Sequence, residues 1–178
     1  LCAELAREPA LSTFALDMRG HGQSTARHGG DPLAWRNFAT ADWERVEEDI
    51  AAVLAHLREQ EHLQPRTIVL IGSSIGSSAV IRAAASDPAV SAIVALSPGR
   101  AYRGLDVIAA ATRLADRSIL VMAGEGETAS ADTARDLARI VPDAELVLVP
   151  GDRHGVAMWA GDADRLARVA RFVREHAR

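Results

Sequence analysis

The stretch from Leu70 to Val80, LIGSSIGSSAV, holds a serine in a setting that could make it a nucleophile. Its residues 72–76 match the pattern G-x-S-x-G, with Ser74 at the centre, directly after a run of strand character and at the start of a helical run. Such a turn strains the serine backbone and projects its hydroxyl beyond the carboxyl edge of a sheet. The Ile75 N–H would then face the oxyanion that develops during attack on a carbonyl.

Two other interpretations compete for this stretch. Glycine and serine are also the small residues expected at any tight joint between a strand and a helix, and the pattern alone does not separate packing from catalysis. Ser77 and Ser78 fit that packing role. Phosphate binding is disfavoured, because no lysine follows the second glycine as in G-x-x-x-x-G-K and the spacing G-x-G-x-x-G is absent.

A catalytic serine needs a base, which parallel sheets place just beyond the carboxyl end of a later strand. His154 meets this requirement in PGDRHG, after the last strand-like run, and a glycine follows it. The remaining histidines lie on or beside helical surfaces or in earlier loops: His21, His28, His56, His62 and His176. His154 is therefore the predicted base.

The acid that would orient this base should follow the preceding strand. The segment GEGETAS there offers Glu125 and Glu127, and Asp132 lies within reach of a long loop. By residue type, Asp132 or Ser130 suits the cap of the next helix. Ser74, an acid at 125–132 and His154 give the chain order serine, acid, histidine.

Strand-like runs alternate with helical segments in the pattern of a parallel α/β sheet. We expect five strands: Ser12–Met18, Arg66–Gly72, Val90–Ser97, Arg117–Gly124 and Glu145–Gly151. The middle three are almost continuously apolar, which predicts helices on both faces. The predicted helices cover Asp42 to about Glu61, the stretch after Gly72, Thr128–Ile140 and Asp162 to about His176. Between Pro98 and Asp116 only a short helix is expected, and hence no lid domain.

Composition and charge narrow the class of protein. The chain has 178 residues, 48% of them hydrophobic and 25% charged, which is typical of one globular domain. A formal charge of -4 with scattered cations argues against a nucleic-acid partner. No apolar run is long enough to span a bilayer. One cysteine, Cys2, favours a reducing compartment, so we expect a cytoplasmic protein, with export left open because the chain lacks an initiator methionine.

Taken together, these segments resemble the α/β hydrolase superfamily over nearly the whole chain. FALDMRGHGQST is similar to the turn after that fold's fourth strand, VLIGSSIGSS to its nucleophile elbow, and PGDRHG to its histidine loop. ILVMAGEGE is similar to the strand and turn that bear the acid, and this resemblance favours Glu127 over Glu125. Further segments resemble compact, lidless bacterial members near the dienelactone hydrolases. Those enzymes carry a cysteine nucleophile where this chain has Ser74.

The resemblance also implies that residues 1–178 form one domain that begins after the fold's third strand. That strand and the loop supplying the second oxyanion donor would then lie outside the chain, so we expect a fragment of a longer protein. An empty slot would separate Ser12–Met18 from Arg66–Gly72. Unpaired backbone groups along that slot would each cost about 1–3 kcal/mol.

The sequence therefore predicts a serine hydrolase that cleaves a small carboxylic ester or related acyl compound through an acyl-enzyme. Ser74 would attack, His154 would transfer the proton, and Glu127 would orient the imidazole; no cofactor or metal is required. A peptidase or acyltransferase would use the same groups. A non-catalytic scaffold acting as a binding protein is the alternative from a different class. The oligomeric state is left open.

Overall fold

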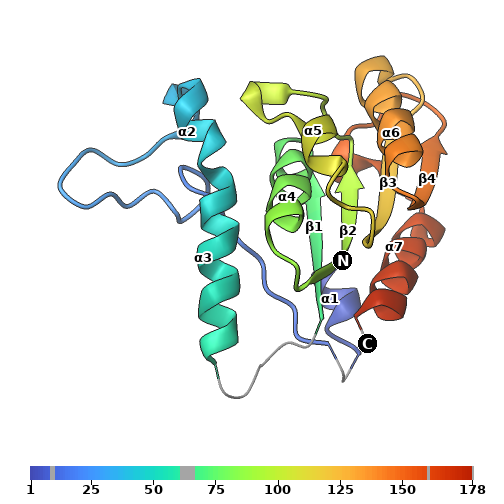
Figure 1. Ribbon diagram of the computed structural model, residues 1–178, viewed down its shortest axis with the longest axis horizontal. Coiled ribbons are helices and arrows are strands. Elements are labelled where there is room, and N and C mark those ends of the chain that lie inside the picture. Colours follow the sequence, from blue (N-terminus) through green and yellow to red (C-terminus); the bar gives the residue numbers. More distant parts are fainter. Residues whose placement is uncertain (9–10, 61–66, 160, 178) are drawn as a thin grey trace.

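The structure is a computed structural model, and it describes residues 1–8, 11–60, 67–159 and 161–177. Its sheet contains four parallel strands in the order β1-β2-β3-β4 (Figure 1). They are β1 (Ile68–Ser73), β2 (Val90–Leu96), β3 (Ser118–Gly124) and β4 (Asp143–Val149). The predicted parallel α/β architecture is confirmed, and these four strands match the last four of the five expected. Arg66, the expected start of one strand, lies outside the described residues.

The first expected strand, Ser12–Met18, is not a strand in the structure. Its segment forms no ladder with any described strand, and the Phe14 and Leu16 side chains are 58% and 37% exposed. A β-favourable run becomes a strand only where a neighbour satisfies its backbone groups. β1 pairs with β2 alone among the described strands, so the side chains of residues 68–71 stay partly exposed instead of fully covered.

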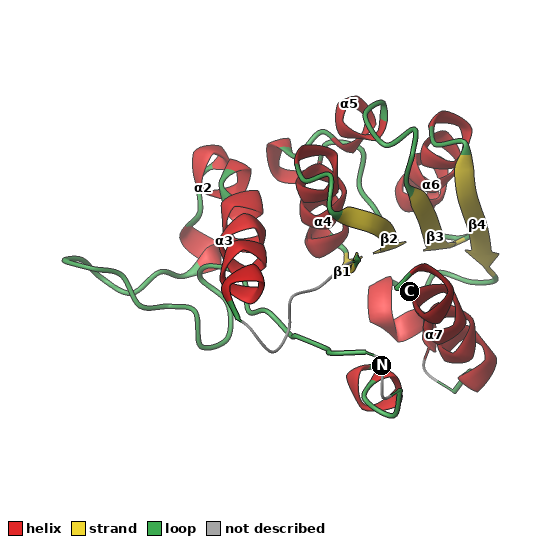
Figure 2. Cartoon of the chain, turned by 60° about the horizontal axis from the view of Figure 1, so that its bottom comes forward, coloured by secondary structure: helices red, strands yellow, loops and turns green. Residues whose placement is uncertain are grey.

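Helices cover both faces of the sheet (Figure 2). One face carries α3 (Val46–Glu59), α4 (Ile75–Ser86), α5 (Val107–Ala111) and α6 (Thr128–Ile140), with α2 (Thr40–Glu44) beside them. The other face carries α1 (Cys2–Leu5) and α7 (Ala163–His176). Three short 3-10 turns complete the elements: η1 (Trp35–Asn37), η2 (Tyr102–Gly104) and η3 (Gly155–Trp159). As expected, the segment between β2 and β3 holds no lid.

The helix predicted from Asp42 to about Glu61 is divided into α2 and α3. Arg45 interrupts it with φ −90° and ψ −2°, and Glu61 lies outside the described residues. Residues on both sides of the interruption are buried in the same core cluster. Trp43 meets Phe38 edge to face, with ring centroids 5.2 Å apart, and Val46 is fully buried. Helical spacing alone carries no signal for such a break.

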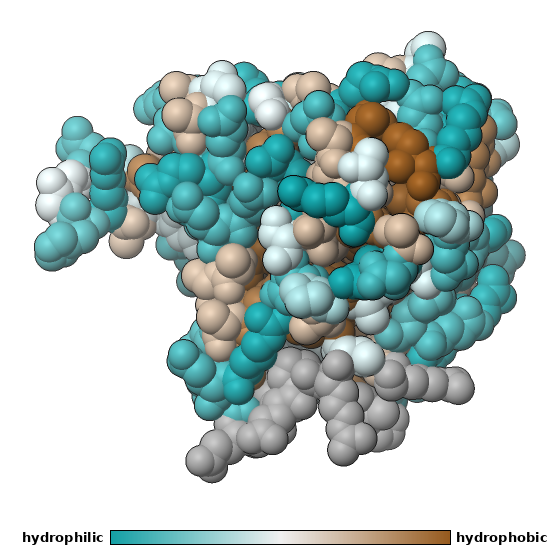
Figure 3. Space-filling view, in the orientation of Figure 1, coloured by the Kyte–Doolittle hydropathy of each residue, from teal (hydrophilic) through white to brown (hydrophobic). Residues whose placement is uncertain are grey.

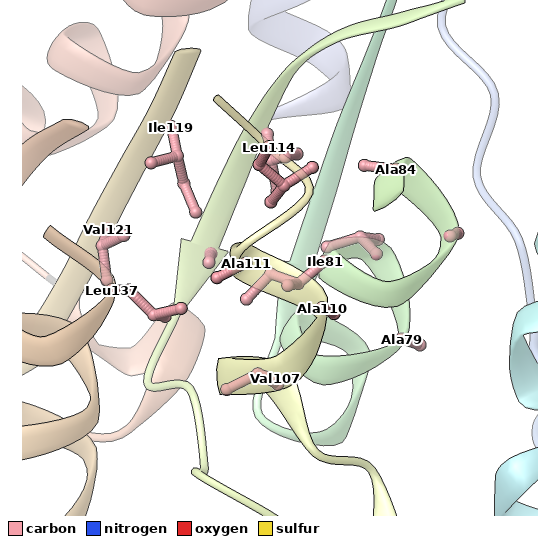
Figure 4. Close-up of a cluster of buried hydrophobic side chains, with 14 of the residues drawn as sticks. Ala79, Ile81, Ala84, Val107, Ala110, Ala111, Leu114, Ile119, Val121 and Leu137 are labelled. Carbon is pink, nitrogen blue, oxygen red and sulfur yellow. The ribbon is translucent and has the colours of Figure 1, made fainter. Parts of the chain in front are cut away.

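The core consists of two clusters of buried side chains, one on each face of the sheet. On the α4 face, Ile81, Leu114 and Leu137 converge on β3 (Figure 4). On the α7 face, Leu120 of β3 packs in the cluster that contains Phe172. By contrast, hydrophilic residues dominate the loop that projects from the α2 end of the molecule (Figure 3).

Candidate active site

The carboxyl ends of all four strands carry a polar side chain of potential chemical use. In strand order these residues are Ser74, Ser97, Glu127 and His154. Backbone bonds continue the ladder past the strand ends, since the Ser74 amide donates to Leu96 O at 2.8 Å and the Ser97 amide to Met122 O at 2.7 Å. Because the strands are parallel, these ends meet at one edge of the sheet, where α/β proteins bind ligands.

Ser74 occupies a strained turn between β1 and α4. Its φ of 56° and ψ of −122° lie outside the regions that residues with a side chain favour. A Cβ on Gly72 would overlap the Gly76 carbonyl, so only glycine allows the strand and helix to approach this closely. A Cβ on Gly76 would meet nothing within 4 Å, so the tight approach does not require the second glycine. Ile75 begins α4, and its amide lies at the positive end of that helix.

His154 contacts one of the three candidate acids. Its Nδ1 is hydrogen-bonded to Glu127 Oε1, and the Glu127 side chain is only 15% exposed. Asp132 instead pairs with Arg135 at 2.8 Å within α6, and Glu125 is exposed. A carboxylate at Nδ1 holds the proton there and leaves Nε2 to accept one. Neither Asp132 nor Ser130 caps α6, since the helix begins after Glu127.

Ser97 links the acid Glu127 to the histidine loop, and no sequence motif identified Ser97 beforehand. The side chain is 2% exposed, and its Oγ donates to Glu127 Oε2 at 2.7 Å while accepting the Gly155 amide at 2.8 Å. Its φ of 49° turns the chain so that both bonds form. The only signal in the sequence is a serine directly after a buried strand.

The histidine loop packs against the turn that holds Ser74. Gly155 has φ 55°, and a Cβ there would overlap Ser73 Oγ, so the residue after His154 touches the residue before Ser74. Within the described part of the chain, the Ser74 hydroxyl makes no hydrogen bond. Catalytic hydrogen bonds often tighten only when substrate binds. The structure therefore brings a serine, an imidazole and a carboxylate to one edge of the sheet.

A cavity of about 190 Å³ opens beside the serine. Its lining consists of His21, Trp35, Trp43, Ser74, Ile75, Tyr102 and Arg103. Three separate segments supply the aromatic wall, in which His21 stacks on Trp35 with centroids 5.5 Å apart. His21, expected only as a loop residue, is thus part of the site. Its Nδ1 lies 3.0 Å from the Arg19 carbonyl.

An ion pair fixes the turn that carries His21. Arg19 donates from Nη2 and Nε to Asp49 on α3, at 2.6 Å and 2.9 Å. Each side chain is 18% exposed. The hydrogen bonds to Asp49 raise the pKa of the Arg19 guanidinium above its ordinary value. The arginine therefore stays charged at neutral pH, and the pair holds one wall of the cavity to α3.

Two further observations on the described residues concern metal binding and membrane spanning. Among the described residues, no three histidine, cysteine, aspartate or glutamate side chains gather closely enough to hold a metal ion. No helix in the described ranges is both long and apolar enough to cross a membrane.

A family model described as serine aminopeptidase, S33, matches residues 1–140. No curated protein matches the sequence. The fold is similar to solved structures at low identity. An esterase from Pyrococcus furiosus has a TM-score of 0.68 at 16% identity, covering 91% of this chain and 69% of the esterase.

Two other structures share the fold. A dienelactone hydrolase from Anabaena variabilis has a TM-score of 0.68 at 18% identity, covering 80% of this chain and 64% of that enzyme. A proline iminopeptidase from Mycobacterium smegmatis has a TM-score of 0.62 at 12% identity, covering 83% of this chain and 77% of that enzyme. The chain thus spans less than two thirds of some of the structures it resembles. At these identities the likeness shows the fold.

Proposed function

The chain belongs to the α/β hydrolases of the serine aminopeptidase S33 family, and from this membership we propose that it is a serine hydrolase of small carboxylic esters or related acyl compounds. The observation that carries the proposal is the contact between His154 Nδ1 and Glu127, at the sheet edge that also bears the strained Ser74. A serine in a strained turn, with a paired acid and base at the same sheet edge, supports one reaction class, acyl transfer.

In the proposed mechanism, Ser74 Oγ attacks the substrate carbonyl carbon while His154 Nε2 takes the hydroxyl proton. Glu127 keeps the imidazole oriented and stabilises its charged form. The Ile75 amide and the amino end of α4 stabilise the oxyanion. The leaving alcohol then receives the proton from His154, which leaves an acyl group on Ser74. Water repeats the sequence, with His154 as its base, and releases the carboxylic acid.

Two observations support small esters as substrates. The cavity beside Ser74 is smaller than the roughly 300 Å³ at which pockets for drug-sized ligands begin, so it suits a short acyl group. Two structural neighbours are an esterase and a dienelactone hydrolase. One observation favours a second candidate, an aminopeptidase: the matching family bears that description, and a proline iminopeptidase shares the fold. Comparing 4-nitrophenyl esters with aminoacyl 4-nitroanilides separates the two.

Labelling with a fluorophosphonate probe tests the proposal. The full-length protein should be labelled, and Ser74→Ala and His154→Ala should abolish or nearly abolish the signal. Ser86→Ala and His56→Ala are matched controls, because both residues are exposed and lie outside the site. Unchanged labelling in Ser74→Ala would overturn the assignment, and no labelling of the folded parent protein would support the non-catalytic scaffold.

A further inference from the structure

The cavity beside Ser74 contains a cation without an acidic partner. Arg103 lines it, and within the described residues its guanidinium forms no ion pair. Glu44 approaches the neighbouring Gly104, yet it does not pair with Arg103. None of the seven described lining residues is acidic. An unpaired positive charge beside the nucleophile is notable in a chain whose net charge is -4.

The backbone holds Arg103 in a costly conformation. Its φ of 56° and ψ of 27° are left-handed, and glycine would adopt them without penalty. The strain is about 1 kcal/mol or more for a residue with a side chain. Packing of α2 against η2 enforces the turn, because a Cβ on Gly104 would press on Thr40 Cγ2 at 2.7 Å. The turn directs the arginine over the aromatic rings of the cavity.

Those rings hold the guanidinium in place. Arg103 Cζ lies 5.6 Å from the Trp43 ring centroid and 5.4 Å from that of Tyr102. Such stacking fixes the plane of a guanidinium while leaving its N–H groups free to donate. The Trp43 side chain is 3% exposed, and its indole N–H is buried out of reach of a ligand in the cavity. Trp43 therefore contributes its ring face and no hydrogen bond to a ligand.

We infer that Arg103, held over the Trp43 and Tyr102 rings, forms a carboxylate-binding subsite, and that the substrate is an ester whose acyl chain ends in a carboxylate. This inference rests on the proposed function, because the acyl group on Ser74 must occupy the adjoining cavity. The aromatic walls would contact the methylene chain, and the Arg103 guanidinium would bind the terminal carboxylate. Guanidinium pairs well with a carboxylate because two parallel N–H donors match its two oxygens.

A pair of substrates tests the subsite: the mono-4-nitrophenyl ester of adipic acid and 4-nitrophenyl hexanoate, which have equal chain lengths and differ in terminal charge. The parent protein should prefer the anionic ester. Arg103→Gln should lower the ratio of kcat/KM for the anionic over the neutral ester about tenfold, as expected for a charge-assisted hydrogen bond. Trp43→Phe keeps an aromatic ring beneath the guanidinium and should leave the ratio within about twofold of the parent, and Arg103→Lys should retain part of the preference.

The controls separate this inference from the proposed function. Arg113→Gln removes an exposed arginine that forms no ion pair within the described ranges, and it should leave the ratio unchanged. Fluorophosphonate labelling of Ser74 should persist in every Arg103 and Trp43 variant. If labelling persists but the ratio is the same in Arg103→Gln as in the parent, the subsite is wrong and the hydrolase stands. If the parent protein is not labelled, both proposals fail.

Discussion

At the scale of single residues, the candidate site depends on two serines with left-handed backbones. Ser74 and Ser97 have φ values of 56° and 49°, and each follows the carboxyl end of a neighbouring strand. Such conformations persist only where surrounding contacts determine them. For Ser97 those contacts are hydrogen bonds to Glu127 and from the Gly155 amide. Ser97 is therefore a positioning residue that couples the acid to the histidine loop.

Replacing Ser97 should reduce turnover more than binding. In Ser97→Ala, Glu127 loses one hydrogen bond and the Gly155 amide loses its acceptor, so the imidazole is held less firmly. We expect kcat for ester hydrolysis to fall on the order of tenfold, with KM changed by less than about twofold. Ser118→Ala is the matched control, because Ser118 contacts Asp143 at the opposite end of the sheet. A large rise in KM with unchanged kcat would contradict the positioning role.

At the residue scale, spacing alone was sufficient to nominate Ser74 and His154. The choice among Glu125, Glu127 and Asp132 needed either the family resemblance or the structure, since all three lie near one strand end. Ser97 carried no motif because its role arises from a backbone angle and two partners that are 30 and 58 residues away. Arg103 was missed for the same reason.

At the scale of elements, the elbow requires β1 and α4 to cross closely. The two glycines of the G-x-S-x-G pattern are not equivalent in this crossing. Gly72 lies where a side chain would overlap the helix backbone, whereas Gly76 faces open space. The fold therefore requires glycine at position 72, whereas Gly76 is a helix residue with low intrinsic helix propensity.

Alanine at these two positions should have opposite effects. Gly72→Ala should destabilise the protein by about 2 kcal/mol or more, because backbone must move to relieve the overlap. Gly76→Ala should be neutral or stabilising by up to about 1 kcal/mol, since alanine favours the helix. Urea unfolding followed by circular dichroism measures both variants side by side. Equal losses of stability would show that the crossing is not the cause.

The ion pair between Arg19 and Asp49 ties the loop of His21 to α3. A double-mutant cycle with Arg19→Gln and Asp49→Asn should give a coupling free energy of about 1–2 kcal/mol. The Asp49 hydrogen bonds raise the pKa of Arg19 above its ordinary value, so the arginine's contribution is complete below its unfolded-state pKa and is lost only as pH rises through the raised value.

The coupling should therefore be the same at about pH 6 and about pH 9. Arg45→Gln is the control, because Arg45 is 62% exposed and pairs with Glu48 on the surface, where such pairs contribute less than about 1 kcal/mol. A coupling that falls between the two pH values would contradict this account of the pair.

The sequence predicted helices and strands well where local propensity and tertiary packing favour the same structure. The bounds of α6 are those expected, since its apolar stripe packs on β3 and β4. Two predictions failed where tertiary context decides. Residues 12–18 have strand composition but no described partner, and a turn at Arg45 divides the helix although Trp43 and Val46 on either side are buried in one cluster.

At the scale of the whole molecule, β3 belongs to both halves of the core. Ile119 contributes to the cluster under α4 to α6, and the adjacent Leu120 contributes to the cluster under α7. Alternate side chains of a strand face opposite sides of a sheet, so neighbouring residues support different layers. Both side chains are fully buried. The strand thus packs against both layers, and the candidate site at its carboxyl end depends on both.

Because β3 packs in both clusters, we predict that the protein unfolds in one cooperative transition. Ile119→Ala and Leu120→Ala should each destabilise the protein by about 2–5 kcal/mol, the cost of a large-to-small change in a packed core. Each variant should still unfold in a single step, with coincident curves by far-ultraviolet circular dichroism and tryptophan fluorescence. Val53→Ala, at a half-buried position on α3, is a milder control. If Leu120→Ala separated the two curves, the layers would unfold independently and β3 would not join them into one unit.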